Sequence, residues 1–346
     1  MNVLCAIQGT GNGRLSRAKD IIPVLKTKGD VDILVSGVQA DISIPYEVKY
    51  QFKGLSFIFG KNGGINFSKT IGQLNFRQFV KEIRTIPIKN YDLIINDFEP
   101  ISAWAAFLKG IPTIGLSHQN AVLNTKSPQH KKIQLESWIL KYYAPTKYKY
   151  GFHFKKYDTA IFTPVIRREI RELQVTNKKH YTVYLPAYSD DKIIKYLSCF
   201  KEIHWEVFSK NSDRFYFNKN IIVQPIQNEA FLKSIASCEG VLCGAGFETP
   251  AEALFLRKKL MVIPMKNQFE QQCNAVALRE LGVSVIKKLG KKQLRKINKW
   301  IKFNQEIPID FPNETAQILN LILENYILKE KKPIYHTIAS LPTFSR

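Results

Sequence analysis

Apolar runs alternate with amphipathic stretches along most of this chain. Each run has the length of a buried strand and is followed by a polar or glycine-containing loop and then by apolar residues at helical spacing. The expected strands in the first half are residues 3–8, 31–36, 55–59, 91–96, 113–116 and 157–164. Those in the second half are residues 181–186, 204–208, 221–223, 241–243 and 260–264. This alternation predicts an α/β fold with parallel sheets.

The helical stretches between these runs suggest two domains and a tail. We expect helices at about residues 14–28, 70–86, 101–109, 165–173, 191–200, 229–237, 249–256, 291–303 and 313–326. The charged helix at 165–173 and the polar residues 176–179 read as a hinge, and 346 residues suffice for two domains of ordinary size. We predict an N-terminal domain of residues 1–168, a C-terminal domain of residues 169–328 and a tail of residues 329–346. The last helix is expected to reach back over the first domain.

The stretch 240–282 carries the clearest candidate binding site. A short apolar run ends at Gly244-Ala245-Gly246, and a helical segment follows. Glycine lets backbone N–H groups come close to an anion. The N-terminus of a helix adds free N–H groups and roughly half a positive charge. We therefore expect Gly244, Ala245 and Gly246 to form a seat for a diphosphate.

Thr249 and Glu252 follow this loop and allow two interpretations. Their three-residue spacing is that of a capping box, in which both side chains bond to the first turn of the helix. Alternatively, the Thr249 hydroxyl binds the phosphates, and Glu252 binds a ribose through its vicinal hydroxyls. Replacing Glu252 with alanine would weaken nucleotide binding in the second case and stability alone in the first.

A second glycine-rich turn follows the first apolar run. Residues 9–17 read GTGNGRLSR, so that Gly11, Gly13 and Arg14 lie close together, with Arg17 one turn further on. Such a turn after a first strand fits many nucleotide-binding folds. An arginine cannot act as a base at neutral pH. Arg14 is therefore expected to neutralise a diphosphate or an acidic acceptor, and we place Gly11, Gly13 and Arg14 in the diphosphate site.

Three side chains at the ends of predicted strands are candidate general bases. Asp97 and Glu99 follow the run 91–96, and His118 follows the run 113–116. Imidazole titrates near neutrality, which favours His118. Asp97 could orient it or take the proton itself. The competing interpretation is that His118 is a satisfied loop histidine and that the two acids cap the following helix.

The charge of the chain is strongly positive, with a formal net charge of +22. Lysines and arginines gather at residues 287–302, and lysines mix with aromatic residues at 138–157. Such segments can be solvated faces over a packed core or docking sites for an anionic bilayer. No apolar run reaches the ~18 residues of a membrane span. The five cysteines show no metal-ligand spacing, so we expect reduced thiols in a cytoplasmic protein. The docking alternative would place it peripherally on the inner face of the membrane.

The residues GAGFETPAEAL, VIP and FEQQCNA within 244–275 resemble the donor-binding signature of inverting, nucleotide-sugar-dependent glycosyltransferases of the GT-B fold. This group (family 28 and its kin) includes the UDP-glucuronosyltransferases, the plant UDP-sugar transferases and the bacterial N-acetylglucosaminyltransferase that completes lipid II. The resemblance implies two Rossmann-like domains facing an interdomain cleft. It also implies that Gly244, Gly246 and Thr249 bind the diphosphate and that Glu252 binds the ribose.

The same resemblance assigns the rest of the donor site. Glu270 and Gln271 are expected to bind the donor sugar, and Ile226 and Phe231 to pack against the base. The relatives often carry a histidine in the first loop, where this chain has Arg14. Asp97-x-Glu99 has the spacing of the metal-binding pair of the other glycosyltransferase fold, but the signature belongs to the metal-free architecture. We therefore expect no metal and no cofactor.

The expected function is transfer of a sugar from a nucleotide diphosphate, most simply UDP, to an acceptor hydroxyl with inversion at the anomeric carbon. The acceptor could be lipid-linked or a cell-envelope glycan, and neither it nor the sugar is named by any motif. One alternative is a non-hydrolysing UDP-sugar epimerase of similar architecture, which would need no acceptor. A remote alternative, motivated by the charge, is a nucleic-acid-binding protein. No nucleic-acid-binding motif occurs, so we expect no nucleic-acid partner.

Overall fold

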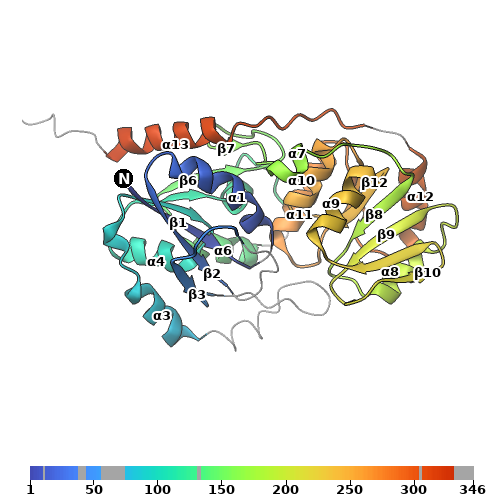
Figure 1. Cartoon of the computed structure of the whole chain (residues 1–346), viewed down its shortest axis with the longest axis horizontal. Coiled ribbons are helices and arrows are strands. Elements are labelled where there is room, and N and C mark those ends of the chain that lie inside the picture. Colours follow the sequence, from blue (N-terminus) through green and yellow to red (C-terminus); the bar gives the residue numbers. More distant parts are fainter. Residues whose placement is uncertain (11, 38–43, 56–74, 131–133, 304–305, 331–346) are drawn as a thin grey trace, which may run out of the picture.

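The computed structural model describes residues 1–10, 12–37, 44–55, 75–130, 134–303 and 306–330. Within these ranges the chain forms two seven-stranded sheets, one after the other. Gly11, most of the strand expected at 55–59 and most of the predicted tail lie outside the described residues. The two sheets, each with its own helices, lie side by side along the long axis of the molecule (Figure 1).

The first sheet is parallel throughout. Its order is β3-β2-β1-β4-β5-β6-β7. The strands are β1 (Asn2–Gln8), β2 (Asp30–Ser36), β3 (Tyr50–Phe52), β4 (Leu93–Asp97), β5 (Ile114–Leu116), β6 (Tyr148–Phe152) and β7 (Ile161–Phe162). Its central strands β1 and β4 are mostly apolar and buried except for the first residue of β1, because helices cover both sides of a parallel sheet.

The second sheet repeats this plan with one antiparallel edge. Its order is β10-β11-β9-β8-β12-β13-β14, and only the β10–β11 pair of the described strands is antiparallel. The strands are β8 (His180–Tyr184), β9 (His204–Ser209), β10 (Tyr216–Asn218), β11 (Ile221–Pro225), β12 (Gly240–Gly244), β13 (Lys259–Ile263) and β14 (Ser284–Val285). The expected α/β fold is confirmed.

Helices flank both sheets. Around the first sheet are α1 (Asn12–Lys26), α3 (Phe76–Thr85), α4 (Pro100–Leu108), α5 (His118–Leu123) and α6 (Gln134–Tyr143). The short α7 (Arg168–Arg171) lies between the sheets in sequence. The second half contributes α8 (Asp190–Leu197), α9 (Asn228–Ser237), α10 (Glu248–Phe255), α11 (Phe269–Glu280), α12 (Leu294–Lys302) and α13 (Thr315–Glu330). Helix α13 returns to pack against α1, so the end of the described chain covers the first sheet (Figure 1).

The two sheets share one hydrophobic core. The largest cluster of buried apolar residues includes Ile7 and Ile95 of the first sheet together with Val241 and Val262 of the second. Aromatic rings fill the space between them: the centroids of Phe154 and Phe247 are 5.2 Å apart. Helices that follow strands of both sheets therefore meet through packed side chains, and this contact positions the polar residues described below.

The two basic segments of the sequence differ in structure. In the segment 287–302, Ile297 and Trp300 of α12 are buried while the lysines face outward. This fits the interpretation of the segment as a solvated basic face. The segment 138–157 divides into two parts. Tyr150 and Phe152 belong to the buried strand β6, whereas the side chain of Trp138 on α6 is 61% exposed.

Candidate functional site

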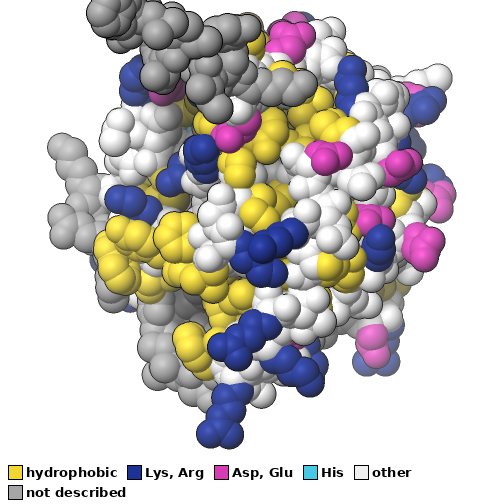
Figure 2. All heavy atoms as spheres, turned by 90° about the vertical axis from the view of Figure 1, so that its left-hand side faces the viewer, with side chains coloured by type: hydrophobic (Ala, Val, Ile, Leu, Met, Phe, Trp, Pro, Cys, Tyr) yellow, Lys and Arg dark blue, Asp and Glu magenta, His cyan; other side chains and the backbone are white. Residues whose placement is uncertain are grey.

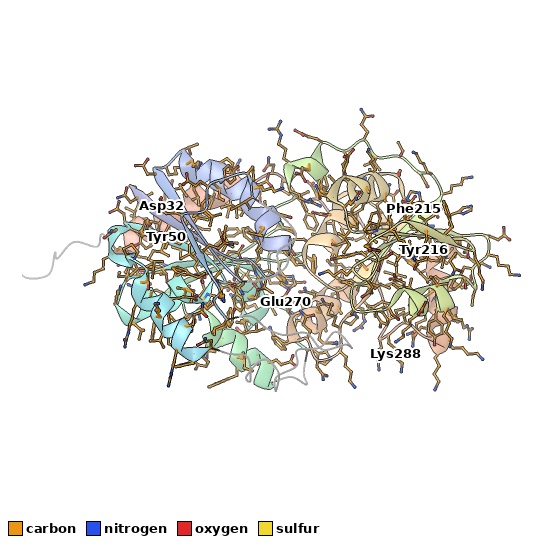
Figure 3. All side chains as sticks on the ribbon, turned by 60° about the horizontal axis from the view of Figure 1, so that its bottom comes forward. Asp32, Tyr50, Phe215, Tyr216, Glu270 and Lys288 are labelled. Carbon is orange, nitrogen blue, oxygen red and sulfur yellow. The ribbon has the colours of Figure 1, made fainter. Side chains whose placement is uncertain are left out.

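The loops at the carboxyl ends of β1, β4 and β5 meet the first turns of α10 and α11, which follow β12 and β13. The polar contacts that cross this junction include those of Arg17 with Glu248, His118 with Asn274, and Gln119 with Glu270. Figure 3 shows Glu270 between the two sheets, with Asp32 and Tyr50 on one side of it and Phe215 and Tyr216 on the other. The carboxyl ends of parallel strands are where α/β folds place their ligands. This junction is therefore the candidate site.

Arg17 is the cation at its centre. The Arg17 side chain is only 2% exposed, and its Nε and Nη2 donate to Oδ2 of Asp97 at 3.3 and 2.7 Å. Its Nη1 donates across the junction to Oε1 of Glu248 at 2.9 Å. Burial raises the pKa of Asp97, and the charge of Arg17 opposes that shift. Because Asp97 is bound to Arg17, it serves better to fix the guanidinium than to accept a proton.

The two predicted glycine loops converge at Glu248. A Cβ atom built on Gly13 would lie 2.3 Å from the Glu248 carboxylate, so a larger residue there would require the flexible Glu248 side chain to move. Gly244 ends β12, and Gly246 immediately precedes the N-cap of α10. A Cβ on Gly246 would meet nothing within 4 Å among the described atoms. The two predicted diphosphate loops thus face one another across the junction. Ala245, which separates Gly244 from Gly246 in the second loop, is buried.

His118 links the two halves of the site. Its ring stacks on Phe247, with centroids 3.9 Å apart. Nδ1 is 2.8 Å from the carbonyl oxygen of Phe152, and Nε2 is 2.9 Å from Oδ1 of Asn274. Both ring nitrogens therefore face oxygens that only accept, and a neutral ring can donate to just one of them, depending on its tautomer. Nε2 is the nitrogen that faces the second domain.

Glu270 and Gln271, the predicted sugar-binding pair, stand at the start of α11. One oxygen of Glu270 accepts from Nε2 of Gln119 at 2.7 Å, and the other lies 4.0 Å from Nε2 of His118. Gln271 accepts from the backbone N–H of Met265 at 3.0 Å. Glu270 is therefore the more available of the two. Within the part of the chain that the structure describes, Oε1 of the buried Gln119 has no hydrogen-bond partner.

Glu252 and Thr249 do not form the capping box that their spacing suggests. Helix α10 starts at Glu248, its N-cap is Phe247, and no side chain caps it. Thr249 consequently lies inside the first turn. Glu252 is 5% exposed, and its two carboxylate oxygens accept from Nε and Nη2 of Arg167 at 2.6 and 3.2 Å. A ribose would have to approach a carboxylate that is already paired.

Glu99 has a structural role. It is fully buried and is the N-cap of α4, where its oxygens accept from the backbone N–H groups of Ile101 and Ser102 at 2.7 and 2.6 Å. This is the capping alternative that the sequence allowed for the two acids. With both oxygens engaged, Glu99 is not retained as a candidate base.

The remaining predicted residues lie at the edge of the site. Nη1 of Arg14 donates to the carbonyl of Thr10 at 3.0 Å, and its guanidinium lies 5.4 Å from the ring centre of Phe98. Ile226 is half-buried after β11. Phe231 packs edge-on against Phe208, with centroids 5.2 Å apart, so part of its surface is used within the domain. None of these contacts brings Arg14 to the convergence point that Arg17 occupies.

His153 is a buried group that the sequence did not single out. It is fully buried beside His118, with ring centroids 5.3 Å apart, and burial and the charge of His118 hold its pKa well below the ordinary value. Its Nδ1 accepts from the backbone N–H of Phe154 at 2.9 Å. No local pattern marks it, because its environment comes from strands far apart in the sequence. Among the described residues, no three His, Cys, Asp or Glu side chains are placed to hold one metal ion.

Comparison with solved structures shows which fold the chain has. The structure of MurG from Acinetobacter baumannii is similar at 15% identity, covering 93% of this chain and 99% of that one, with a TM-score of 0.56. MnaA of S. aureus, solved with UDP, matches at 8% identity over 96% and 98% of the two chains, with a TM-score of 0.58. The glycosyltransferase SnogD from Streptomyces nogalater matches at 11% identity over 94% and 99%, with a TM-score of 0.54. At such identities these matches establish the fold, which is GT-B.

The sequence comparison identifies the family. No curated protein matches the sequence at a significant level. A model of the family described as Glycosyl transferase family 1 matches residues 1–304, which is most of the chain and includes both sheets. The resemblance found in residues 244–275 is confirmed at the level of glycosyltransferases of the GT-B fold. The chain belongs to glycosyl transferase family 1.

Proposed function

We propose that this glycosyltransferase moves a sugar from a UDP-sugar to an acceptor hydroxyl and inverts the configuration at the anomeric carbon. The observation that carries the proposal is the convergence of Gly13, Arg17 and the glycine-preceded N-terminus of α10 at one point between the sheets. A diphosphate at this point would meet a fixed guanidinium from the first domain and free backbone N–H groups from the second.

The leaving group is stabilised by fixed charges and dipoles in this proposal. As the bond to the sugar breaks, negative charge grows on the diphosphate. Arg17 is held in place by Asp97, so it needs little reorganisation to stabilise that charge. The donor sugar would lie toward Glu270, and the base toward Ile226 and Phe231. No step requires a metal ion, so we expect full activity in the presence of EDTA.

His118 is the proposed general base. Its Nδ1 faces the carbonyl of Phe152, and its Nε2 faces Oδ1 of Asn274 and the carboxylate of Glu270. Nε2 would take the proton of the acceptor hydroxyl once the acceptor replaces Asn274 beside it. The His118 side chain is 2% exposed, so the acceptor reaches it only when the domains part. Asp97, the alternative base, positions Arg17 instead.

The acceptor is proposed to be lipid-linked, and the face that would dock on a bilayer is visible in the first domain. Trp104 of α4 bonds through Nε1 to the carbonyl of Tyr143 of α6, which brings the two helices together. The α4–α6 patch comprises Trp104, Phe107, Leu108, Trp138 and Tyr142, most of which are strongly exposed. Lys141 lies over the ring of Tyr142 at 5.6 Å. Hydrophobic side chains and cations also lie side by side on the far end of the first domain (Figure 2), whereas α6 lies nearer the second sheet (Figure 1).

An aromatic patch beside lysines suits the surface of an anionic membrane, where rings enter the headgroup region and lysines meet phosphates. No described helix is long and apolar enough to cross a bilayer. We therefore propose a cytoplasmic enzyme that binds the inner face of the membrane peripherally.

The proposal is tested by calorimetry with a panel of UDP-, GDP- and TDP-sugars, followed by NMR of the anomeric configuration of the product. We expect one UDP-sugar to bind and the product to carry the inverted configuration, with turnover unaffected by EDTA. Incubation with the donor alone separates the epimerase alternative. An epimerised UDP-sugar formed without acceptor would contradict the transferase assignment.

A further inference from the structure

The carboxylate of Glu248 lies where the diphosphate is proposed to bind. It stands in the first turn of α10, directly after the Gly244–Gly246 loop. It also lies so close to Gly13 that a Cβ atom there would overlap it. A carboxylate and a phosphate are both anions that favour a helix N-terminus and a guanidinium. Glu248 thus makes, within the protein, the contacts expected of one phosphate group.

The partners of Arg17 are arranged so that one can be exchanged. Asp97 accepts from Nε and Nη2 and is 11% exposed, whereas Glu248 takes only Nη1 and is 31% exposed. If Glu248 moved away, Arg17 would still be paired with Asp97 and would keep its position. The cost of leaving a buried charge unpaired would not arise. The more exposed side chain of Glu248 has room to move toward solvent.

We propose that Glu248 is a resident counter-ion of Arg17 and that the diphosphate of the donor replaces it. This inference rests on the proposed function. The Arg17–Glu248 bond joins the two domains through their own side chains. When a diphosphate binds, its charge repels the Glu248 carboxylate, and Nη1 of Arg17 transfers its hydrogen bond to a phosphate oxygen. The domains are then joined through the donor.

Moving Glu248 away from Arg17 costs free energy, and the free energy of donor binding is less favourable by that cost. A glutamine at this position keeps the size of the side chain but removes the charge that competes with the phosphates. Glu248→Gln is therefore expected to bind UDP roughly tenfold more tightly than the wild type, because like charges placed side by side oppose binding. Uridine has no phosphate, so its affinity is expected to stay the same.

The experiment is isothermal titration calorimetry of UDP and uridine with the full chain, as wild type, Glu248→Gln and Glu229→Gln. Glu229 is a matched control: it also stands in the first turn of a second-domain helix, but its side chain is 81% exposed and pairs with Lys233. We expect tighter UDP binding in Glu248→Gln alone, with uridine unchanged throughout. A thermal melt of each variant confirms that it is folded.

The other outcomes are distinct. If the wild type binds UDP and Glu248→Gln binds it no more tightly, Glu248 is not a competitor and the inference is overturned while the proposed function stands. Equal gains for UDP and uridine, or the same gain in Glu229→Gln, also overturn it. If no form of the protein binds UDP, the proposed function fails and the inference fails with it.

Discussion

Arg167 and Glu252 form a two-point ion pair: Nε lies 2.6 Å from Oε1, and Nη2 lies 3.2 Å from Oε2. Arg167 precedes α7, in the segment between the two sheets, and Glu252 lies in the second turn of α10. Both side chains are at most 10% exposed. The pair therefore ties the segment between the domains to the helix that begins at the proposed diphosphate seat.

Glu252→Ala is expected to lower both stability and UDP affinity. Removing Glu252 leaves Nε and Nη2 of the buried Arg167 without this carboxylate, while Nη1 keeps Glu169 and Asn228. We expect this to cost about 3 kcal/mol of unfolding free energy. If the carboxylate also binds the ribose, UDP affinity falls by more than the loss of folded protein accounts for. Chemical denaturation and calorimetry with UDP measure the two effects.

Glu169→Ala is the control for this variant. Glu169 also bonds to Arg167, at 3.1 Å, but its side chain is 40% exposed. Such a pair contributes at most about 1 kcal/mol, so little should change. If Glu252→Ala loses stability but binds UDP as tightly as the wild type, Glu252 does not bind the ribose and is a structural residue.

Gly246→Ala tests the loop before α10. A Cβ at Gly246 meets no described atom within 4 Å, so the unfolding free energy should stay constant or rise by up to ~1 kcal/mol. The added methyl group would stand between the backbone N–H groups and a phosphate, and we expect UDP to bind about tenfold more weakly. Gly290→Ala, where a Cβ is equally free, should leave UDP binding unchanged. Equal UDP affinity in both variants would place the diphosphate elsewhere.

Stability at acid pH is expected to depend on His153. Its pKa lies well below the ordinary value of 6.5, through burial and the charge of His118. Below pH 6.5 the unfolded chain therefore binds a proton at this residue that the folded chain does not, and stability falls as the pH falls. The slope is about 1.4 kcal/mol per pH unit for one proton.

His153→Phe removes this titration while the neighbouring carboxyl groups stay the same. The loss of unfolding free energy between pH 7 and pH 5 should be smaller in the variant than in the wild type by more than about 1 kcal/mol. Denaturant unfolding at both pH values measures it, with exposed His204→Gln as control. An identical loss in all three proteins would show that His153 protonates equally well in the folded state.

Membrane binding should depend on the α4–α6 patch. Replacing Trp138, which is 61% exposed on α6, with alanine is expected to reduce co-sedimentation with vesicles rich in anionic lipid severalfold, because the indole ring no longer enters the headgroup region. Phe217→Ala provides the comparison, since Phe217 is 69% exposed but lies on β10 of the second domain. Equal sedimentation of both variants, or equal binding to neutral vesicles, would argue against this docking face.

Periodicity predicted the fold because parallel strands covered on both faces are long apolar runs. The central strands β1, β4, β8 and β12 all overlap predicted runs, with bounds that differ by one or two residues. The strands without a prediction are β3, β6, β10 and β14. Three of them are two or three residues long, too short for a pattern. The fourth, β6, alternates aromatic residues with lysine and glycine, which resembled a surface segment as much as a buried strand.

Features of the site that depend on neighbouring residues could be predicted from the sequence. Contacts between residues far apart in the sequence could not. The position of the glycine loop before α10 and the capping of α4 by Glu99 both depend on residues only a few positions apart. Spacing suggested a capping box for Glu252, but its partner Arg167 lies 85 residues away in sequence. Glu248 gave no signal at all, because its importance arises only when Gly13 and Arg17 of the other domain meet it.

A diphosphate bound between Arg17 and the N-terminus of α10 would be seen in a crystal structure of the protein with UDP. We predict a phosphate oxygen within hydrogen-bonding distance of Nη1 of Arg17 and of backbone N–H groups in residues 246–248, with the Glu248 side chain moved away. UDP bound anywhere outside this junction would disprove the proposed donor site, and Arg17 still bonded to Glu248 beside a bound UDP would disprove the exchange.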